Sequence, residues 1–119
     1  MKIALPVTDK EAKNVSLHFG PSPYFLLFDE NGKEEGILGN ESSHFGGAKL
    51  PPAFLKENGV GCVICCDMGP NAVQMCSKLG IEVRFAQPGA SVKETLLLFK
   101  EGKLRKASDG DGCESHKGH

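Results

Sequence analysis

The sequence has 119 residues, of which 39% are hydrophobic and 24% are charged, and this composition is typical of a globular domain that buries its own core. Its formal net charge of −1 gives no reason to expect binding to nucleic acid or to an acidic membrane surface. No stretch approaches the roughly 18 apolar residues of a membrane-spanning helix, and we expect no secretory leader. A cytoplasmic protein is therefore predicted, whose five cysteines are thiols, metal ligands or core residues rather than disulfides.

Three strands are predicted in the first third of the chain. Residues 2–7 (KIALPV) form an apolar run that suits a buried strand. Residues 24–30 (YFLLFDE) and 33–40 (KEEGILGN) flank Asn31-Gly32, a sequence typical of a tight hairpin turn. We therefore expect an antiparallel hairpin, which is separated from the first strand by a polar loop and followed by a loop rich in glycine and serine.

The second part of the chain alternates helices with strands. Residues 60–67 (VGCVICCD) have almost no polar side chain, which fits a strand at the centre of a sheet that is covered on both faces. The last helix begins with the capping-box pattern, a serine followed three residues later by a glutamate. Helices are predicted for residues 52–59, 69–80 and 91–104, and one more strand for residues 81–86.

The order of these elements predicts an α/β fold. Parallel crossovers in the second half indicate a three-layer α/β/α sandwich around a mixed sheet of five strands. We expect this domain to cover residues 1–106. From Ala107 onward (ASDGDGCESHKGH) the sequence has no apolar periodicity, so residues 107–119 are expected to form a flexible tail that contains cysteine and histidine.

Three cysteines fall within five positions of the central strand. Cys62 and Cys65 have the C-x2-C spacing of many zinc and iron–sulfur sites, in which a turn brings both sulfur atoms to one side. The residues between them, Val63 and Ile64, favour extended backbone instead. Because side chains alternate along a strand, Cys62 and Cys65 should point to opposite faces as core residues. Cys76, on the apolar stripe of the next helix, is also expected in the core.

Ligands of α/β proteins collect where the parallel strands end, and the central strand ends at Cys66, Asp67 and Met68. The next residues open a helix at Gly69, whose first amide groups are unpaired and carry the positive end of the helix dipole. An anionic ligand at this corner would meet backbone donors beside a thiolate, a carboxylate and a thioether. Whether Cys66 faces a ligand stays open at this point.

Two histidines lie in the predicted loops. His18 and His44 are each followed by Phe-Gly, and neither has the i, i+4 partner of a helical metal site. Each is therefore either a solvated residue or a ligand. In the tail, Cys113, His116 and His119 have the spacing C-x2-H-x2-H, which suits zinc, copper, nickel or iron. The alternative is a disordered, solubilising end.

Taken together, several blocks of the sequence resemble the dinitrogenase iron–molybdenum cofactor-binding family, the small domains related to nitrogenase cofactor carriers. The resemblance runs from Met1 to about Leu104. The blocks that carry it are KIALPVTD, VSLHFGPSPYFLLFD, HFGGAKLPPAFLKENGV, MGPNAVQMCSKLGIEV and GASVKETLLLFKEGKL, in this order. The stretch CVICCDMG departs from the commonest pattern of the family, in which an apolar strand ends in small residues.

The resemblance implies a ribonuclease H-like fold and a protein that binds or carries an iron–sulfur or iron–molybdenum-type cluster, rather than an enzyme. It implies cofactor-binding residues in three loops, and these are His18, Phe19, Gly20, His44, Gly46, Gly47, Cys66, Asp67, Met68, Gly69 and Asn71. The candidate metal ligands are His18, His44, Cys66, Cys113, His116 and His119, with zinc or another transition metal as the alternative at the tail. The expected partners are the cluster and a protein that donates or accepts it.

Two other functions compete with a cluster carrier. A nuclease, suggested only by the fold name, needs several carboxylates at the centre of the sheet, but the first strand has none and Asp67 alone cannot hold two metal ions. A thiol–disulfide exchanger usually has its C-x-x-C pair at a helix N-terminus, whereas Cys62 and Cys65 lie inside a predicted strand. A metallochaperone or metal-storage protein that uses the tail remains the alternative function and is compatible with the first.

Overall fold

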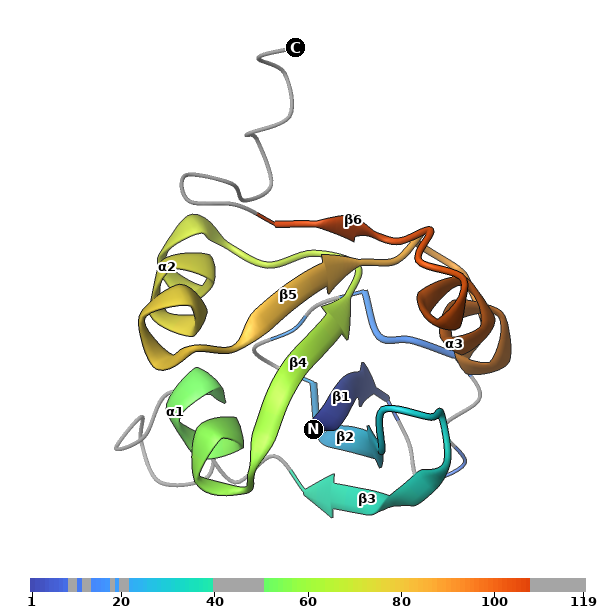
Figure 1. Ribbon diagram of the computed structural model, residues 1–119, viewed down its shortest axis with the longest axis horizontal. Helices are drawn as coiled ribbons and strands as arrows, with labels where there is room; N and C mark the ends of the chain where they lie inside the picture. The colour runs from blue at the N-terminus through green and yellow to red at the C-terminus, as the bar shows by residue number, and fades with distance from the viewer. Residues whose placement is uncertain (9–10, 12–13, 18, 20–21, 40–50, 108–119) are drawn as a thin grey trace, which may run out of the picture.

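The computed structural model describes residues 1–8, 11, 14–17, 19, 22–39 and 51–107. Within these residues six strands form one mixed sheet (Figure 1). They are β1 (Lys2–Val7), β2 (Tyr24–Phe28), β3 (Glu34–Gly39), β4 (Val60–Cys65), β5 (Glu82–Phe85) and β6 (Arg105–Lys106), in the spatial order β3-β2-β1-β4-β5-β6. β1, β4 and β5 are parallel to one another, and each remaining strand runs antiparallel to its neighbour nearer the centre.

The described residues also form three helices, α1 (Pro51–Glu57), α2 (Pro70–Leu79) and α3 (Val92–Lys100). The predicted capping box of α3 is confirmed, because the Ser91 hydroxyl accepts from the Glu94 amide at 3.1 Å while the Glu94 carboxylate accepts from the Ser91 amide at 3.3 Å. α2 ends at Leu79 and is capped by Gly80, whose φ of 78° is the left-handed conformation that glycine adopts without strain. No helix in the described part of the chain is long and apolar enough to cross a membrane.

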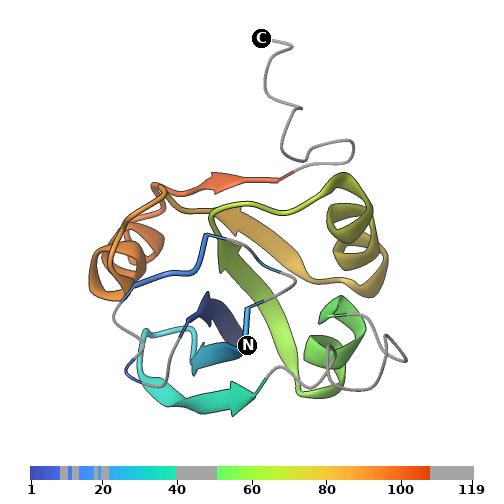
Figure 2. The ribbon, with the colours of Figure 1, turned by 180° about the vertical axis from the view of Figure 1, so that it is seen from behind.

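Helices cover both faces of the sheet, so the predicted three layers are present (Figures 1 and 2). α1 and α2 pack on one face through Phe54, Leu55 and Val73. α3 packs on the other face, where Val92 joins strand residues such as Ile3 and Leu5. β1 and β4 lie at the centre and are buried on both faces, which explains why their sequences have no polar–apolar alternation.

The predicted number of five strands was one too few within the described residues, because β6 was not expected. The predicted last helix, residues 91–104, ends at Lys100 instead. Gly102 then turns the chain with a φ of 74°, and Leu104 is buried on the α3 side of the sheet. Ala107, the first residue of the predicted tail, follows β6 directly and donates its amide hydrogen to the Val83 carbonyl at 2.8 Å.

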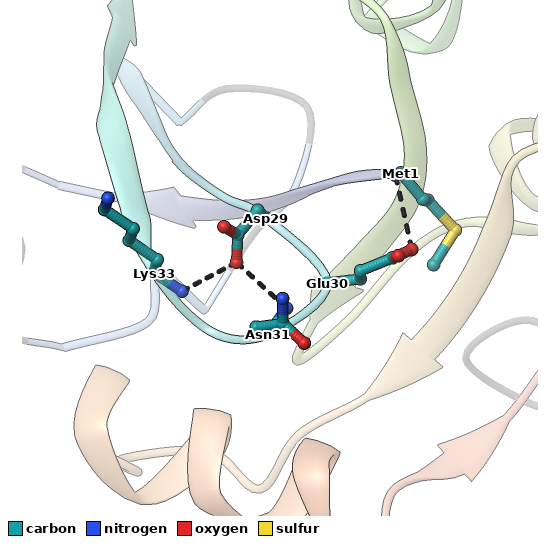
Figure 3. Close-up of polar contacts among 5 residues, drawn as sticks. All are labelled: Met1, Asp29, Glu30, Asn31 and Lys33. Carbon is teal, nitrogen blue, oxygen red and sulfur yellow. Dashed lines mark hydrogen bonds and ion pairs between the residues drawn. The ribbon is translucent and has the colours of Figure 1, made fainter.

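The predicted hairpin between β2 and β3 is confirmed, and a carboxylate organises its turn (Figure 3). Asp29 accepts hydrogen bonds from the amides of Asn31 and Lys33, both at 2.9 Å. The Lys33 hydrogen bond is the main reason why the pKa of Asp29 lies below its ordinary value. Beside the turn, the N-terminal ammonium group of Met1 pairs with the carboxylate of Glu30 at 3.3 Å. This ion pair links the start of the chain to the turn between β2 and β3.

Candidate functional site

The register of the sheet brings the predicted loops to one edge, the one at which the parallel strands have their carboxyl ends. β1, β4 and β5 end at this edge because they are parallel. The antiparallel partners meet them there, since Tyr24 at the start of β2 pairs with Val7 at the end of β1 and also with Gly39 at the end of β3. The chain therefore leaves the sheet at this edge before each of the two histidine-containing loops and again after β4 and β5.

The first loop is anchored on both sides of His18. Before it, the Ser16 amide donates to the Pro6 carbonyl at 2.7 Å, and the Val15 amide donates to the Ala90 carbonyl at 3.3 Å. After it, the Ser22 hydroxyl donates to the Val7 carbonyl at 2.8 Å. These contacts tie the loop to β1 and to the turn between β5 and α3.

Phe19 provides a further anchor within the same loop. Its side chain is 3% exposed, and its ring lies 5.7 Å from the ring of Phe25 on β2. Phe19, predicted as a cofactor-binding residue, is thus part of the core on the α1/α2 side. The neighbouring predicted residues His18 and Gly20 lie outside the described residues.

The corner after β4 contains the other predicted residues. Cys66 and Asp67 are half-buried, and Gly69 and Asn71 are exposed. Gly69 has extended backbone at the N-cap of α2 and offers no side-chain cap to the first turn of this helix. Met68 is 2% exposed and packs in the core between the sheet, α1 and α2, so its thioether is held inside the protein.

The alternation predicted for the cysteines of β4 is confirmed. Cys65 packs on the α1/α2 face of the sheet and Cys62 on the α3 face, so a single metal ion cannot bind both. Cys76, on α2, lies in the same core as Cys65. Burial raises the pKa of Cys62 and of Cys76 to about 12 and also raises that of Cys65, so all three remain neutral thiols at physiological pH.

Cys66 differs from these three because it is partly accessible and has a defined polar contact. Its sulfur atom lies 3.6 Å from the backbone oxygen of Gln87, to which the thiol donates. Burial raises the pKa of Cys66, and the nearby carboxylate of Asp67 raises it further. The side chain at this edge is therefore a protonated thiol at neutral pH.

No group of three or more His, Cys, Asp or Glu side chains that could hold a metal ion occurs within the described residues. Most of the predicted ligands lie outside those residues, so the predicted metal set stays a prediction. The predicted residues not described are His18, Gly20, His44, Gly46, Gly47, Cys113, His116 and His119.

Sequence analysis missed two features. The anchors of the first loop, Ser16 and Ser22, bond to backbone atoms of β1, far along the chain, and no local pattern indicates such partners. A cavity of about 240 Å³ also lies between α2, β5 and the end of β6, with Val73, Ser77 and Ala107 among its lining residues. Because it includes the start of β5, it lies toward the opposite end of the strands from the loops.

Comparison with known proteins agrees with this architecture. The chain is 34% identical to an uncharacterized protein of Methanocaldococcus jannaschii over 111 residues, which are 89% of this chain and 91% of that one. It is similar to the apo form of the orange protein from Desulfovibrio gigas, with a TM-score of 0.78, 23% identity, and coverage of 91% of this chain and 93% of that one. At this identity, the likeness to the orange protein shows the shared fold.

A third similarity is to the NMR structure of a Thermotoga protein of the DUF35 family that is described as a putative NifB protein. Here the TM-score is 0.68 and the identity 29%, with 88% of this chain and 91% of that one covered. Residues 1–102 match the profile of the family described as dinitrogenase iron–molybdenum cofactor, a span that includes all three helices and every strand except β6. The chain belongs to the dinitrogenase iron–molybdenum cofactor family.

Proposed function

We propose that this protein binds and carries a metal–sulfur cluster that contains iron or molybdenum, without catalysing a reaction, on a ribonuclease H-like fold. Family membership supports the class of cargo. The observation that carries the proposal is the meeting of four chain segments at one edge of the sheet, where Val7, Gly39, Cys65 and Phe85 end their strands. A site assembled from several loops can surround a compact cluster on many sides.

The residue types near this edge suit such a cargo. Metal–sulfur clusters bind imidazole or thiolate groups, and their sulfide atoms accept hydrogen bonds from backbone amides. His18 and His44 would supply imidazole groups, and the first turn of α2 would supply amides at the positive end of its dipole. Cys66, predicted from the sequence as a ligand, lies at the same edge. Such a carrier would work in the cytoplasm and exchange its cargo with a donor or acceptor protein.

The test is to purify the protein without oxygen and to measure bound iron, molybdenum, copper, zinc and sulfide together with the visible spectrum. We expect stoichiometric sulfide and charge-transfer absorption, before or after reconstitution. His18→Ala and His44→Ala should lower the cluster content, whereas the control Cys62→Ala should keep it, because Cys62 lies in the core away from the loops. A protein that takes up no sulfide under any of these conditions would contradict the proposal.

The alternative function is metal delivery or storage by the C-terminal segment, and the spacing of Cys113, His116 and His119 favours it. A chain that ends at Ala107 distinguishes the two. If the protein is colourless, binds only zinc and loses that zinc on truncation, the metal belongs to the C-terminal segment. If cluster content survives truncation, the cluster site lies within residues 1–107.

A further inference from the structure

The thiol of Cys66 extends the contact between the ends of β4 and β5. The last backbone hydrogen bond between these two segments is donated by the Ala86 amide to the Cys65 carbonyl at 2.8 Å. One residue further along each strand, the Cys66 sulfur reaches the Gln87 carbonyl at 3.6 Å. A side chain thus continues the pairing of the two strands beyond the point where the backbone can do so.

The Gln87 carbonyl is also the first acceptor of a tight turn. The Ala90 amide donates to it at 3.1 Å, which closes residues 87–90, with Gly89 at a φ of 84°. The Ala90 carbonyl then accepts from the Val15 amide at 3.3 Å. The Cys66 thiol therefore contacts the 87–90 turn, and this turn in turn contacts Val15, which precedes His18 in the sequence.

A second bridge strengthens the link between the turn and the loop. Asn14 pairs with Ser91, the N-cap of α3, in an isolated antiparallel bridge. Residues 14–16 therefore lie between β1, through the Ser16–Pro6 hydrogen bond, and the turn that Cys66 contacts. The path from Cys66 to this segment consists of three hydrogen bonds, Cys66–Gln87, Ala90–Gln87 and Val15–Ala90.

We propose that Cys66 serves the cluster site as a hydrogen-bond donor that positions the 87–90 turn and the 14–16 segment, rather than as a thiolate ligand. This inference takes the identity of the cargo from the proposed function, whereas the positioning contacts do not depend on it. A thiol can donate to the Gln87 carbonyl only while it keeps its proton, and a thiolate bound to a metal has none.

Two substitutions separate a donor from a ligand. Cys66→Ser keeps an O–H donor but removes the thiolate, whereas Cys66→Ala removes both. In the apo protein, amide hydrogen exchange followed by NMR should show Val15 and Ala90 exchanging about threefold to tenfold faster in Cys66→Ala, the range for loss of one hydrogen bond. In Cys66→Ser their exchange should stay within about twofold of the unmodified protein.

Uptake of cargo gives the second readout, with ferrous iron, molybdate and sulfide added together without oxygen. The donor role predicts that Cys66→Ser takes up as much sulfide as the unmodified protein, while Cys66→Ala takes up less. Cys62→Ala is the matched control, because Cys62 lies on the same strand but is buried in the core. In this control the Val15 and Ala90 amides should exchange at the same rate, relative to the amides of β1, as in the unmodified protein.

Unchanged exchange of Val15 and Ala90 in Cys66→Ala would overturn the proposal, since the contact would then position nothing. Loss of sulfide uptake in both variants, with Val15 protected in Cys66→Ser, would also overturn it in favour of a thiolate ligand. If the unmodified protein itself takes up no sulfide, the proposed function fails. The exchange measurement still decides the positioning role in that case.

Discussion

Alkaline pH should destabilise this protein strongly, because three of its thiols are buried in the core. Cys62, Cys65 and Cys76 have an ordinary pKa of 9.0, and burial is the largest cause of the increase at each of them. In the folded state the pKa reaches about 12 at Cys62 and Cys76. Between these values the unfolded chain loses thiol protons that the folded chain keeps. Stability is therefore fully present below pH 9 and falls as pH rises toward 12.

The size of the effect follows from linkage. At pH 10, one unit above the ordinary value, each buried thiol lowers the free energy of unfolding by about 1.4 kcal/mol relative to neutral pH. Three thiols together lower it by about 4 kcal/mol. This is a large part of the roughly 5–15 kcal/mol that stabilises a typical domain.

Urea unfolding at pH 7, 8, 9 and 10 under reducing conditions, followed by far-ultraviolet circular dichroism, measures this loss. Cys76→Ala is the informative variant. It lowers stability at neutral pH by creating a cavity, but it should reduce the drop between pH 7 and 10 from about 4 to about 3 kcal/mol. Other groups that titrate in this range affect both proteins equally. Equal drops in the two proteins, or thiolate absorbance that appears near pH 9 in the folded state at Cys62, would refute the reasoning.

Phe19→Ala should lower the free energy of unfolding by about 3 kcal/mol, because it removes a buried ring. Leu17→Ala, in the same loop but 53% exposed, should change it by less than about 0.5 kcal/mol; similar losses in urea unfolding would show that Phe19 is not buried. An NMR titration should place the pKa of Asp29 below 3.8, mainly because the Lys33 amide donates to it. The stability that this contact contributes is present above pH 3.8 and is lost as the pH falls through the pKa of Asp29 in the folded state. A measured pKa at or above 3.8 would contradict the turn geometry. Gly80→Ala should cost about 1 kcal/mol in thermal unfolding, because an L residue is strained at a φ of 78°; an unchanged melting temperature would exclude this conformation.

Apolar runs, helical spacing and turn residues were sufficient to predict the larger elements. β4 was recognisable because it has almost no polar side chain, as expected of a central strand that is covered on both faces. The opposite facing of Cys62 and Cys65 then followed from strand geometry alone. β6 could not be predicted in this way, because two charged residues have no measurable period, and their place in the sheet depends on pairing with β5.

The candidate site shows the same limit. Parallel topology predicts that loops gather at the carboxyl ends of the strands, and the register of Val7, Tyr24 and Gly39 agrees with that prediction for the loop origins. The contacts that hold the first loop, however, join residues far apart in the chain. Neither the Ser22–Val7 bond nor the Cys66–Gln87 contact leaves a local pattern, since each acceptor is a backbone oxygen that any residue provides.

β6 covers the outer side of β5, where another chain could otherwise pair. β5 contains Val83 and Phe85, and without a neighbour its outer backbone groups would form an open edge that can pair with another chain. β6 covers that edge with two charged residues, and the Arg105 guanidinium lies 4.6 Å from the centre of the Phe85 ring. Truncation before Arg105 should therefore produce aggregates, whereas a chain that ends at Ala107 keeps β5 covered by a short, charged strand.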